Sequence, residues 1–238
     1  MEELRRTFHQ ELEEVRESIL ILGRSVVEAV PRATEILLSG DLEGADYLIQ
    51  ADDEHDARAL DIESTCFQHL ALQAPVAGDL RKLVSYIKIA SELERSADLT
   101  VNICKAARRI YGHAIDPVLH GLIKKMSEQS QQLCSSALEA FENDDAPKAA
   151  AIDDMDSFLD SLHRQFVQEI FESHSRGHID LQVAVQLAVA ARFYERIGDH
   201  AVNIGERTRF ILTGWVPELK GATRHRAKLE NSGEIPRP

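Results

Sequence analysis

The ten-residue segment ERSADLTVNI, residues 94–103, returns later in the chain as ERIGDHAVNI, residues 195–204. The two copies are 195 − 94 = 101 residues apart, and each carries Glu, Asp and Asn at positions i, i+4 and i+8. On a helix this spacing places the three side chains along one stripe. An acidic stripe kept in both halves of a duplicated helical chain indicates two similar sites, and it indicates that those sites hold cations.

The duplication extends upstream of this segment. Asp79 matches Asp180 at the same offset, whereas Asp41 matches Asp145 at an offset of 104 residues. The difference of three residues predicts a longer loop between the second and third helices of the first copy. A repeat of about a hundred residues is too long for a solenoid unit. The sequence therefore predicts two copies of a small domain, at residues 1–113 and 114–216.

Each copy has the pattern of three helices. Apolar residues recur at helical spacing, as at Leu93, Ala97 and Val101, and no stretch alternates with period two as a strand would. Asp41 is a good N-cap for the second helix, and Pro31 predicts a kink or a break inside the first. The predicted fold is all-α, with two tandem antiparallel three-helix bundles. The expected helices cover residues 4–38, 42–74, 80–111, 117–141, 146–173 and 181–212.

Composition narrows the class of protein. The chain has 238 residues, of which 44% are hydrophobic and only 5% aromatic, so a sizeable core would be aliphatic. No apolar run approaches the roughly 20 residues of a membrane span, and the N-terminus lacks a signal-peptide pattern, so we expect a cytoplasmic protein. Three cysteines without CxxC spacing argue against a disulfide framework or a thiolate metal site. The net charge of −13 argues against direct binding of nucleic acid.

The last part of the chain differs from the rest. Residues 217–238 carry five basic and three acidic side chains, a net charge of +2, which leaves −15 for the remainder. Three prolines and few apolar residues predict that this segment is disordered. A basic tail can touch a partner or a membrane surface, although a solvated terminus is the commoner outcome.

The acidic stripes have counterparts on the second helix of each copy. Those helices carry the carboxylate pairs Asp52/Asp56 and Asp156/Asp160. Two helices of one bundle can then face four carboxylates at one another, which makes an oxygen-rich cage for a divalent ion or a multinuclear cluster. Four carboxylates held together without cations would repel one another strongly. The pattern therefore favours metal binding.

Ordinary ion pairs along a helix surface are the competing explanation. Arg95 lies three residues before Asp98, and Arg192 lies three residues before Glu195, so each guanidinium can reach its carboxylate. Two features favour the metal: the motif survives in both copies, and the stripe lies at the edge of the apolar seam. The metal itself is left open among magnesium, manganese, calcium, iron and zinc.

The histidines near these carboxylates are not predicted ligands. His55 and His163 each follow an aspartate by three residues, but their positions are not equivalent between the two copies. Each is therefore interpreted as a surface histidine. His200 directly follows Asp199, so it lies on a different face of the helix.

Taken together, these motifs resemble the PhoU family of bacterial phosphate-signalling regulators. The two E-R-x-x-D-x-x-x-N helices, the two D-x-x-x-D helices and the segment LQAPVAGDLR at residues 72–81 carry the resemblance, which covers about residues 4–214. The opening RTFHQEL at residues 6–12 is similar to actinobacterial members in particular. The second copy keeps the usual E-R-I-G-D, whereas the first has Ser96 and Ala97 in place of Ile and Gly. Because Ala97 is still small, we expect only modest change there.

The resemblance implies two tandem three-helix bundles and a protein that is not an enzyme. It implies a divalent metal or a multinuclear metal cluster, with iron, zinc, magnesium or manganese as the ion. Asn102 and Asn203 would be supporting ligands or would donate hydrogen bonds to the ligands. The carboxylate ligands carried over onto this chain are Asp52, Asp56, Glu94 and Asp98 in the first copy and Asp156, Asp160, Glu195 and Asp199 in the second.

The function that the resemblance implies is negative regulation of the phosphate-starvation response and of phosphate uptake. The chain would act as an adaptor between a sensor histidine kinase of the phosphate two-component system and the ATPase subunit of the phosphate ABC transporter. We also expect a homodimer, with membrane association only through these partners.

Two alternatives to this function stay open. One is a carboxylate-bridged metalloenzyme of the di-iron type, although the chain has no Glu-x-x-His motif. The other is a purely structural helical scaffold.

Overall fold

The computed structural model describes residues 2–216, so the disorder predicted for residues 217–238 lies outside the described residues. The described chain forms long helices and contains no strand, which confirms the predicted all-α fold. None of these helices has the combination of length and apolar character that a membrane span requires. The helices are α1 (Glu2–Ser39), α2 (Leu42–Gln73), α3 (Ala77–Arg109), α4 (Pro117–Glu142), α5 (Ala146–Ser175) and α6 (Leu181–Thr213).

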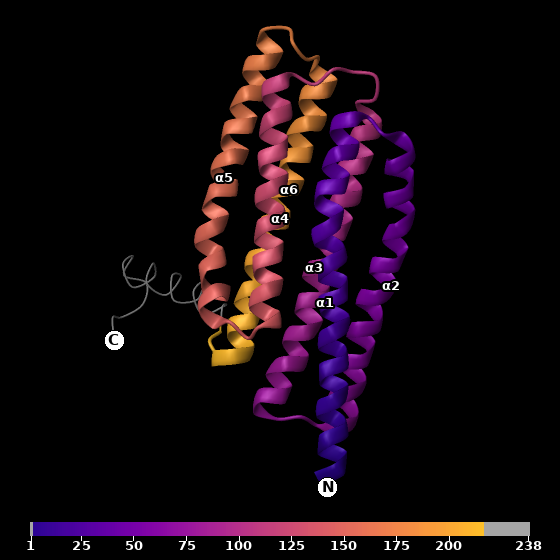
Figure 1. The fold of residues 1–238 in the computed structure, drawn as a ribbon, viewed down its shortest axis with the longest axis vertical. Helices are drawn as coiled ribbons and strands as arrows, with labels where there is room; N and C mark the ends of the chain where they lie inside the picture. The colour runs from indigo at the N-terminus through magenta and orange to yellow at the C-terminus, as the bar shows by residue number, and fades with distance from the viewer. Residues whose placement is uncertain (1, 217–238) are drawn as a thin grey trace, which may run out of the picture.

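The helices form two three-helix bundles that lie side by side in an elongated molecule (Figure 1). α1, α2 and α3 pack against one another, and so do α4, α5 and α6. The bundles meet where α3 lies against α6 and α1 lies against α4. Each helix at this junction therefore contacts its own counterpart from the other repeat. The buried apolar residues of both bundles form one continuous core.

The helices differ in how much of their surface is covered. α3 touches α1, α2 and α6, and its buried residues follow one another almost without interruption from Ser96 to Ala107. α2 buries only a narrow stripe, which includes Ala45, Ile62 and Cys66. α2 and α5 are thus outer helices, and α3 and α6 are the central ones. This difference decides which side chains remain available for function.

Aspartates begin four of the helices. The carboxylates of Asp41, Asp116, Asp145 and Asp180 each accept a hydrogen bond from a backbone N–H two or three residues later, at 2.8–2.9 Å. Such an N-cap satisfies one of the N–H groups that lack a partner inside the helix and stabilises by about 1 kcal/mol. The predicted cap at Asp41 is confirmed.

The prediction of a longer loop in the first copy is wrong. α2 has 32 residues against 30 for α5, and α3 begins three residues before the position that matches the start of α6. The connection between α2 and α3 is residues 74–76, which is shorter than residues 176–180 between α5 and α6. The extra residues of the first copy lengthen helices and not the loop.

The tight connection explains this result. The sequence places Asp79 at the start of α3, but the helix begins at Ala77, with Val76 as an N-cap that makes no side-chain hydrogen bond. Ala74 and Ala77 adopt positive φ angles of 43° and 49°, a conformation unusual for alanine. These two residues turn the chain within a few positions, so Asp79 falls in the first helical turn.

α1 continues through Pro31 to Ser39 without the break that the sequence suggested. Because proline has no N–H, the carbonyl of Val27 loses its donor within the helix. Gln131 of α4 replaces that donor: its side-chain Nε2 donates to the Val27 carbonyl at 3.3 Å. The neighbouring helix therefore satisfies the carbonyl that the proline leaves without a partner.

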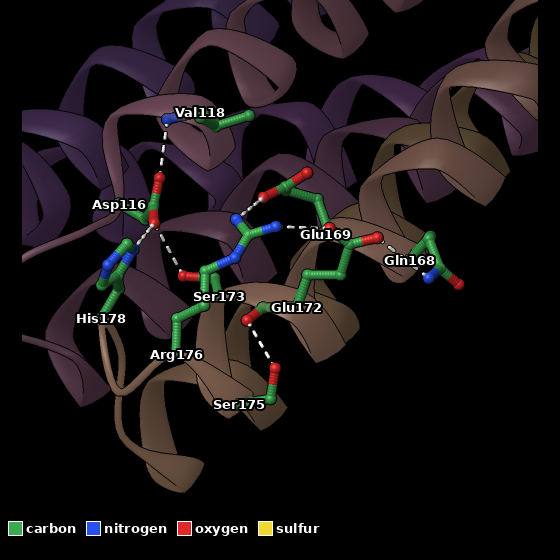
Figure 2. A network of polar contacts seen from close by, with 9 residues as sticks. All are labelled: Asp116, Val118, Gln168, Glu169, Glu172, Ser173, Ser175, Arg176 and His178. Atoms are coloured by element: carbon green, nitrogen blue, oxygen red, sulfur yellow. Dashed lines mark hydrogen bonds and ion pairs between the residues drawn. The ribbon is translucent and has the colours of Figure 1, made fainter.

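A polar cluster holds the start of α4 to the end of α5 (Figure 2). Asp116 is only 6% exposed. One carboxylate oxygen accepts from the Val118 backbone N–H at 2.8 Å, and the other accepts from the Ser173 hydroxyl at 2.9 Å and lies 2.8 Å from His178 Nδ1. The Val118 hydrogen bond is the main cause that lowers the pKa of Asp116. The cluster fixes the point where the chain enters the second bundle.

Candidate functional site

The predicted carboxylates of the second copy come together between α5 and α6. Asp156 and Asp160 lie one turn apart on α5, and Glu195 and Asp199 lie one turn apart on α6. The pKa of Asp156 is raised to about 6, mainly by burial. The charges of the three other carboxylates and of Asp153 add to this effect. Burial also raises the pKa values of Glu195 and Asp199. The four side chains therefore form one interacting acidic site.

The first copy has the same arrangement between α2 and α3. Burial, and then the charges of Asp56 and Asp98, raises the pKa of Asp52. Burial, and then Asp98 and Asp56, raises the pKa of Glu94. A cavity of about 270 Å³ opens between the two helices and reaches Asp56 and Glu94. His55 Nδ1 lies 3.6 Å from Asp52 Oδ1, so this histidine sits beside the first site.

Both sites contain buried carboxylate oxygens without a hydrogen-bond partner among the described residues. They are Asp52 Oδ1, Asp156 Oδ1 and Glu195 Oε2. An unpaired buried acceptor costs about 1–3 kcal/mol, and native proteins leave few of them. A cation would satisfy these oxygens and would remove the repulsion between the carboxylates. An all-oxygen donor set of this kind fits a hard or borderline divalent ion.

The carboxylates do not form a finished coordination sphere. Among residues 2–216, no three His, Cys, Asp or Glu side chains lie close enough together to hold a metal ion as they stand. Ligation at either site would therefore require side-chain rotation toward the ion, or water between some carboxylates and the ion.

The two sites differ in one cationic side chain. In the second copy, Arg192 forms an ion pair with Glu195, one turn along α6, as the sequence suggested. The matching residue of the first copy is Ser91, because 192 − 101 = 91, so Glu94 has no arginine at that position. The second site thus carries a guanidinium of its own, whereas the first opens into the cavity described above.

Gly198 allows α6 to lie close to the α5 carboxylates. A Cβ atom at this position would be 2.5 Å from Asp156 Oδ1 and 2.6 Å from Leu159 Cδ2. The equivalent residue of the first copy is Ala97, which is fully buried. The first pair of helices therefore accommodates a methyl group that the second pair excludes.

The predicted supporting asparagines are not equivalent in what they contact. The Asn203 side chain forms a hydrogen bond with Glu92 of α3. Burial raises the pKa of Glu92, and this hydrogen bond offsets part of that rise. Asn203 is thus directed at the other bundle and away from Glu195, because eight residues turn an α-helix by about 80° beyond full turns. Asn102 is half-buried on α3. Support of a metal by either asparagine stays a prediction.

Sequence reasoning missed a buried polar cluster between the bundles. His200 is 6% exposed, and its Nδ1 lies 3.0 Å from the Ser96 hydroxyl. Its Nε2 lies 4.0 Å from Glu92 Oε2. Burial, and then two arginines, lowers the pKa of His200 to about 4. The neutral histidine therefore serves as a hydrogen-bonding residue where α6 crosses α3.

A sequence signal for this cluster exists in hindsight. Glu92, Ser96 and Thr100 are polar and recur every four residues on α3, on a face different from that of Glu94. The neighbouring positions on α3 are largely apolar. A row of polar residues on a helix face that is otherwise buried indicates that a polar side chain of another helix packs against it.

The serine, histidine and aspartate of Figure 2 do not form a catalytic triad. Ser173 is fully buried, and its hydroxyl donates to Asp116. A nucleophilic serine needs its hydroxyl bonded to the histidine, which in turn is oriented by the carboxylate. Here the serine and the histidine both contact the same carboxylate, so the cluster is a structural cap.

Comparisons with known proteins agree with this architecture. Residues 19–107 and 123–208 each match the family model of the PhoU domain. The starts of the two segments are 104 residues apart and their ends 101 residues apart, the same two offsets that relate the repeats. The chain is 33% identical over 215 residues to phosphate-specific transport system accessory protein PhoU homolog 1 of Mycobacterium tuberculosis, covering 90% of this chain and 96% of that protein. It is 34% identical to PhoU homolog 2 of the same species, covering 90% and 100%.

Solved structures show the same arrangement of helices. The phosphate transport system regulatory protein PhoU from Streptococcus pneumoniae superposes with a TM-score of 0.80 at 30% identity, covering 87% of this chain and 98% of that chain. PhoU from Pseudomonas aeruginosa superposes with a TM-score of 0.81 at 28% identity, covering 87% and 100%. With both repeats matched and relatives of similar length, this chain belongs to the PhoU family.

Proposed function

We propose that this protein is a cytoplasmic negative regulator of the phosphate-starvation response and of phosphate uptake, acting as a metal-binding adaptor without catalytic activity. Its relatives are named accessory or regulatory proteins of phosphate transport. The observation that carries the proposal is the pair of acidic sites, one in each repeat, where two helices face four carboxylates at one another.

In this proposal the acidic sites hold divalent ions or multinuclear clusters of iron, zinc, magnesium or manganese. The buried oxygens of Asp52, Asp156 and Glu195 that lack a partner support this assignment. A bound cation supplies positive charge that neutralises facing carboxylates. The carboxylates themselves then hold α2 to α3 and α5 to α6, since each site draws its ligands from both helices of its pair. The loaded protein is a stiffer body for a partner to recognise.

The proposed partners are the sensor histidine kinase of the phosphate two-component system and the ATPase subunit of the phosphate ABC transporter. By contacting both, a homodimeric adaptor would hold the kinase in its phosphatase-biased state while phosphate is plentiful. The strongly acidic body, with a net charge of −13 for the whole chain, favours basic surfaces on those partners.

The regulatory function is tested by phosphate-starvation gene expression in phosphate-rich medium. Expression should be high in a deletion strain without any second PhoU-family gene, and the wild-type protein should return it to its low level. Glu195→Ala/Asp199→Ala should fail to do so. The matched control is Glu13→Ala/Glu17→Ala, two exposed carboxylates one turn apart on α1. Unchanged expression in the deletion strain would show that the chain is not a negative regulator.

The metal and the partners are tested separately. Elemental analysis of the purified, extensively washed protein should find divalent metal, and the Glu195→Ala/Asp199→Ala variant should hold less of it. Absence of stoichiometric metal, together with no thermal stabilisation by iron, zinc, magnesium or manganese, would support the scaffold alternative.

Co-purification with the kinase and the ATPase at physiological salt tests the adaptor. If neither is retained, with or without metal, the proposed partners are wrong.

A further inference from the structure

We propose that the outer groove between α2 and α3 binds one amphipathic helix of a partner protein, whose apolar side is flanked by lysine or arginine. The proposal goes beyond the regulatory function because it identifies a surface and the chemistry of its partner. Its apolar contacts come from side chains outside the acidic sites, whereas Asp56 and Glu94 at one end of the groove belong to the first site.

A line of apolar and small residues runs along the outer side of α2. Leu60 is 66% exposed and Phe67 is 53% exposed. Together with Ser64 and Ala71 they occupy positions i, i+4, i+7 and i+11, which form one stripe on a helix. These four residues also line a shallow hollow on the helix surface. Exposed apolar patches bordered by polar residues are typical of interaction sites.

A second apolar line lies on α3, and its residue Ile87 borders the same groove. Leu80, Val84 and Ile87 follow the same spacing, and Leu80 is 41% exposed. Leu60 and Ile87 both line the cavity of about 270 Å³ between the helices. Two antiparallel helices with facing apolar lines leave a groove whose shape suits a third helix. This is the arrangement by which amphipathic helices bind apolar grooves.

The second repeat keeps part of this apolar surface, because Phe67 is matched by Phe171 and Leu80 by Leu181, both of them exposed. At the offset of 104 residues, Leu60 is matched by Arg164 and Ala71 by Ser175. At the offset of 101 residues, Ser91 is matched by Arg192. The pair of α5 and α6 therefore folds with arginine at two positions where the first pair has leucine and serine. The fold therefore does not require an apolar residue at the position of Leu60, which is available for contact with a partner.

The charge of α2 selects the partner. Residues 42–73 contain eight acidic side chains and one arginine, a balance of −7 with histidines neutral. Glu63 lines both hollows, and Asp56 and Glu94 close one end of the groove. A second copy of the chain placed symmetrically here would set two such helices against each other, and an anionic lipid surface would be repelled in the same way. A helix with basic flanks matches both the apolar floor and the acidic rim.

The test uses the full-length protein and a fluorescent synthetic helix as the probe. The peptide carries leucine at positions i, i+4, i+7 and i+11 with lysine on both flanks, and a second peptide has glutamate in place of every lysine. Fluorescence anisotropy at physiological salt should show saturable binding of the lysine peptide alone. Leu60→Gln/Phe67→Gln should weaken binding by at least about tenfold, because two central apolar contacts are lost. The substitutions are exposed and neutral, so thermal unfolding should match that of the wild type.

The matched control is Phe158→Gln/Phe171→Gln, which removes two exposed aromatic residues from α5, the counterpart of α2. This variant should bind the lysine peptide like the wild type. Equal binding by the α2 variant, or equal binding of the glutamate peptide, would overturn the proposal. So would a wild-type dimer that dissociates in the α2 variant by analytical ultracentrifugation, or binding to phosphatidylglycerol vesicles that is lost in that variant. Those two results would assign the groove to a second copy or to a membrane.

Discussion

Burial beside three other carboxylates raises the pKa of Asp156 to about 6, above the ordinary value of 3.8. The folded chain therefore retains a proton there that the unfolded chain has already released between about pH 4 and pH 6. Below this range both states are protonated, and the group does not affect the free energy of unfolding. As the pH rises through the range, that free energy falls, and it stays lower at neutral pH. The metal-free site thus destabilises the fold under the conditions where it would bind a cation.

Asp156→Asn should stabilise the metal-free protein at about pH 7.5 by about 1 kcal/mol, because it removes one charge from a partly exposed cluster. At about pH 2.5 the gain should disappear, since the aspartate is then protonated in both states. Thermal unfolding in chelator at the two pH values measures both effects. Asp154→Asn, at an exposed position on α5, is the control and should change little. A loss of stability in Asp156→Asn at neutral pH would contradict this account.

Gly198→Ala should destabilise the protein by about 1–3 kcal/mol, because the new methyl group overlaps Asp156 and Leu159. Gly121→Ala on α4 is the control, since a Cβ there meets no heavy atom within 4 Å. That substitution should stabilise by about 0.5–1 kcal/mol, the usual gain of alanine over glycine inside a helix. Urea unfolding of the two variants provides the comparison. Equal effects would show that α5 moves freely away from α6.

Individual residues were predictable from the sequence where one helix is enough to place them. The spacing of Glu195 and Asp199 fixes them on one stripe, and the matching pair on the preceding helix of the repeat supplies the opposite side. His200 was not predictable in this way. Its partners Ser96 and Glu92 are 104 and 108 residues away along the chain. They become neighbours only because α6 crosses α3, which the periodicity of a single helix does not specify.

At the scale of helices, the sequence predicts positions well and connections poorly. Aspartate N-caps and apolar periodicity act locally, so all six helices were expected close to where they lie. The length difference between repeats is also visible in the sequence. It does not say whether added residues extend a helix or a loop, and here Ala74 and Ala77 make a turn tight enough to keep them helical.

Gln131→Ala should cost about 1 kcal/mol, because it removes the donor to the Val27 carbonyl. Pro31→Ala restores a backbone N–H at the position that normally serves this carbonyl. In the Pro31→Ala background, the cost of Gln131→Ala should therefore shrink. A double-mutant cycle from urea unfolding measures the coupling between α1 and α4. Strictly additive effects would mean that the Gln131 side chain does not replace the N–H donor that Pro31 removes from the Val27 carbonyl.

At the scale of the whole molecule, the two bundles share one core. α3 lies as extensively against α6 as against α2, and the buried apolar residues continue from one bundle into the other. Separating the bundles would expose buried polar groups such as His200 and Ser96 together with apolar surface. The sequence revealed the duplication but not this junction. Apolar periodicity predicts that one face of a helix is buried, but it does not predict which helix packs against that face.

The full chain should therefore unfold in one cooperative transition, with equal calorimetric and van't Hoff enthalpies. Differential scanning calorimetry checks this at a pH where the protein is soluble. Ser96→Ala/His200→Phe is the informative variant, because it alters only the junction and should lower the midpoint without splitting the transition. Two resolved transitions in the wild type would show that the bundles are independent folding units.

The junction of α1 with α4 and of α3 with α6 pairs each helix with its own copy, as in a dimer of two identical half-length chains. In such an ancestor every mutation would have appeared twice, once in each subunit. A single polypeptide that holds both copies is free of that constraint. One half of this chain accordingly has Leu60 and Ser91 where the other has Arg164 and Arg192. The internal repeat thus provides a symmetric scaffold whose two sides can carry different surfaces.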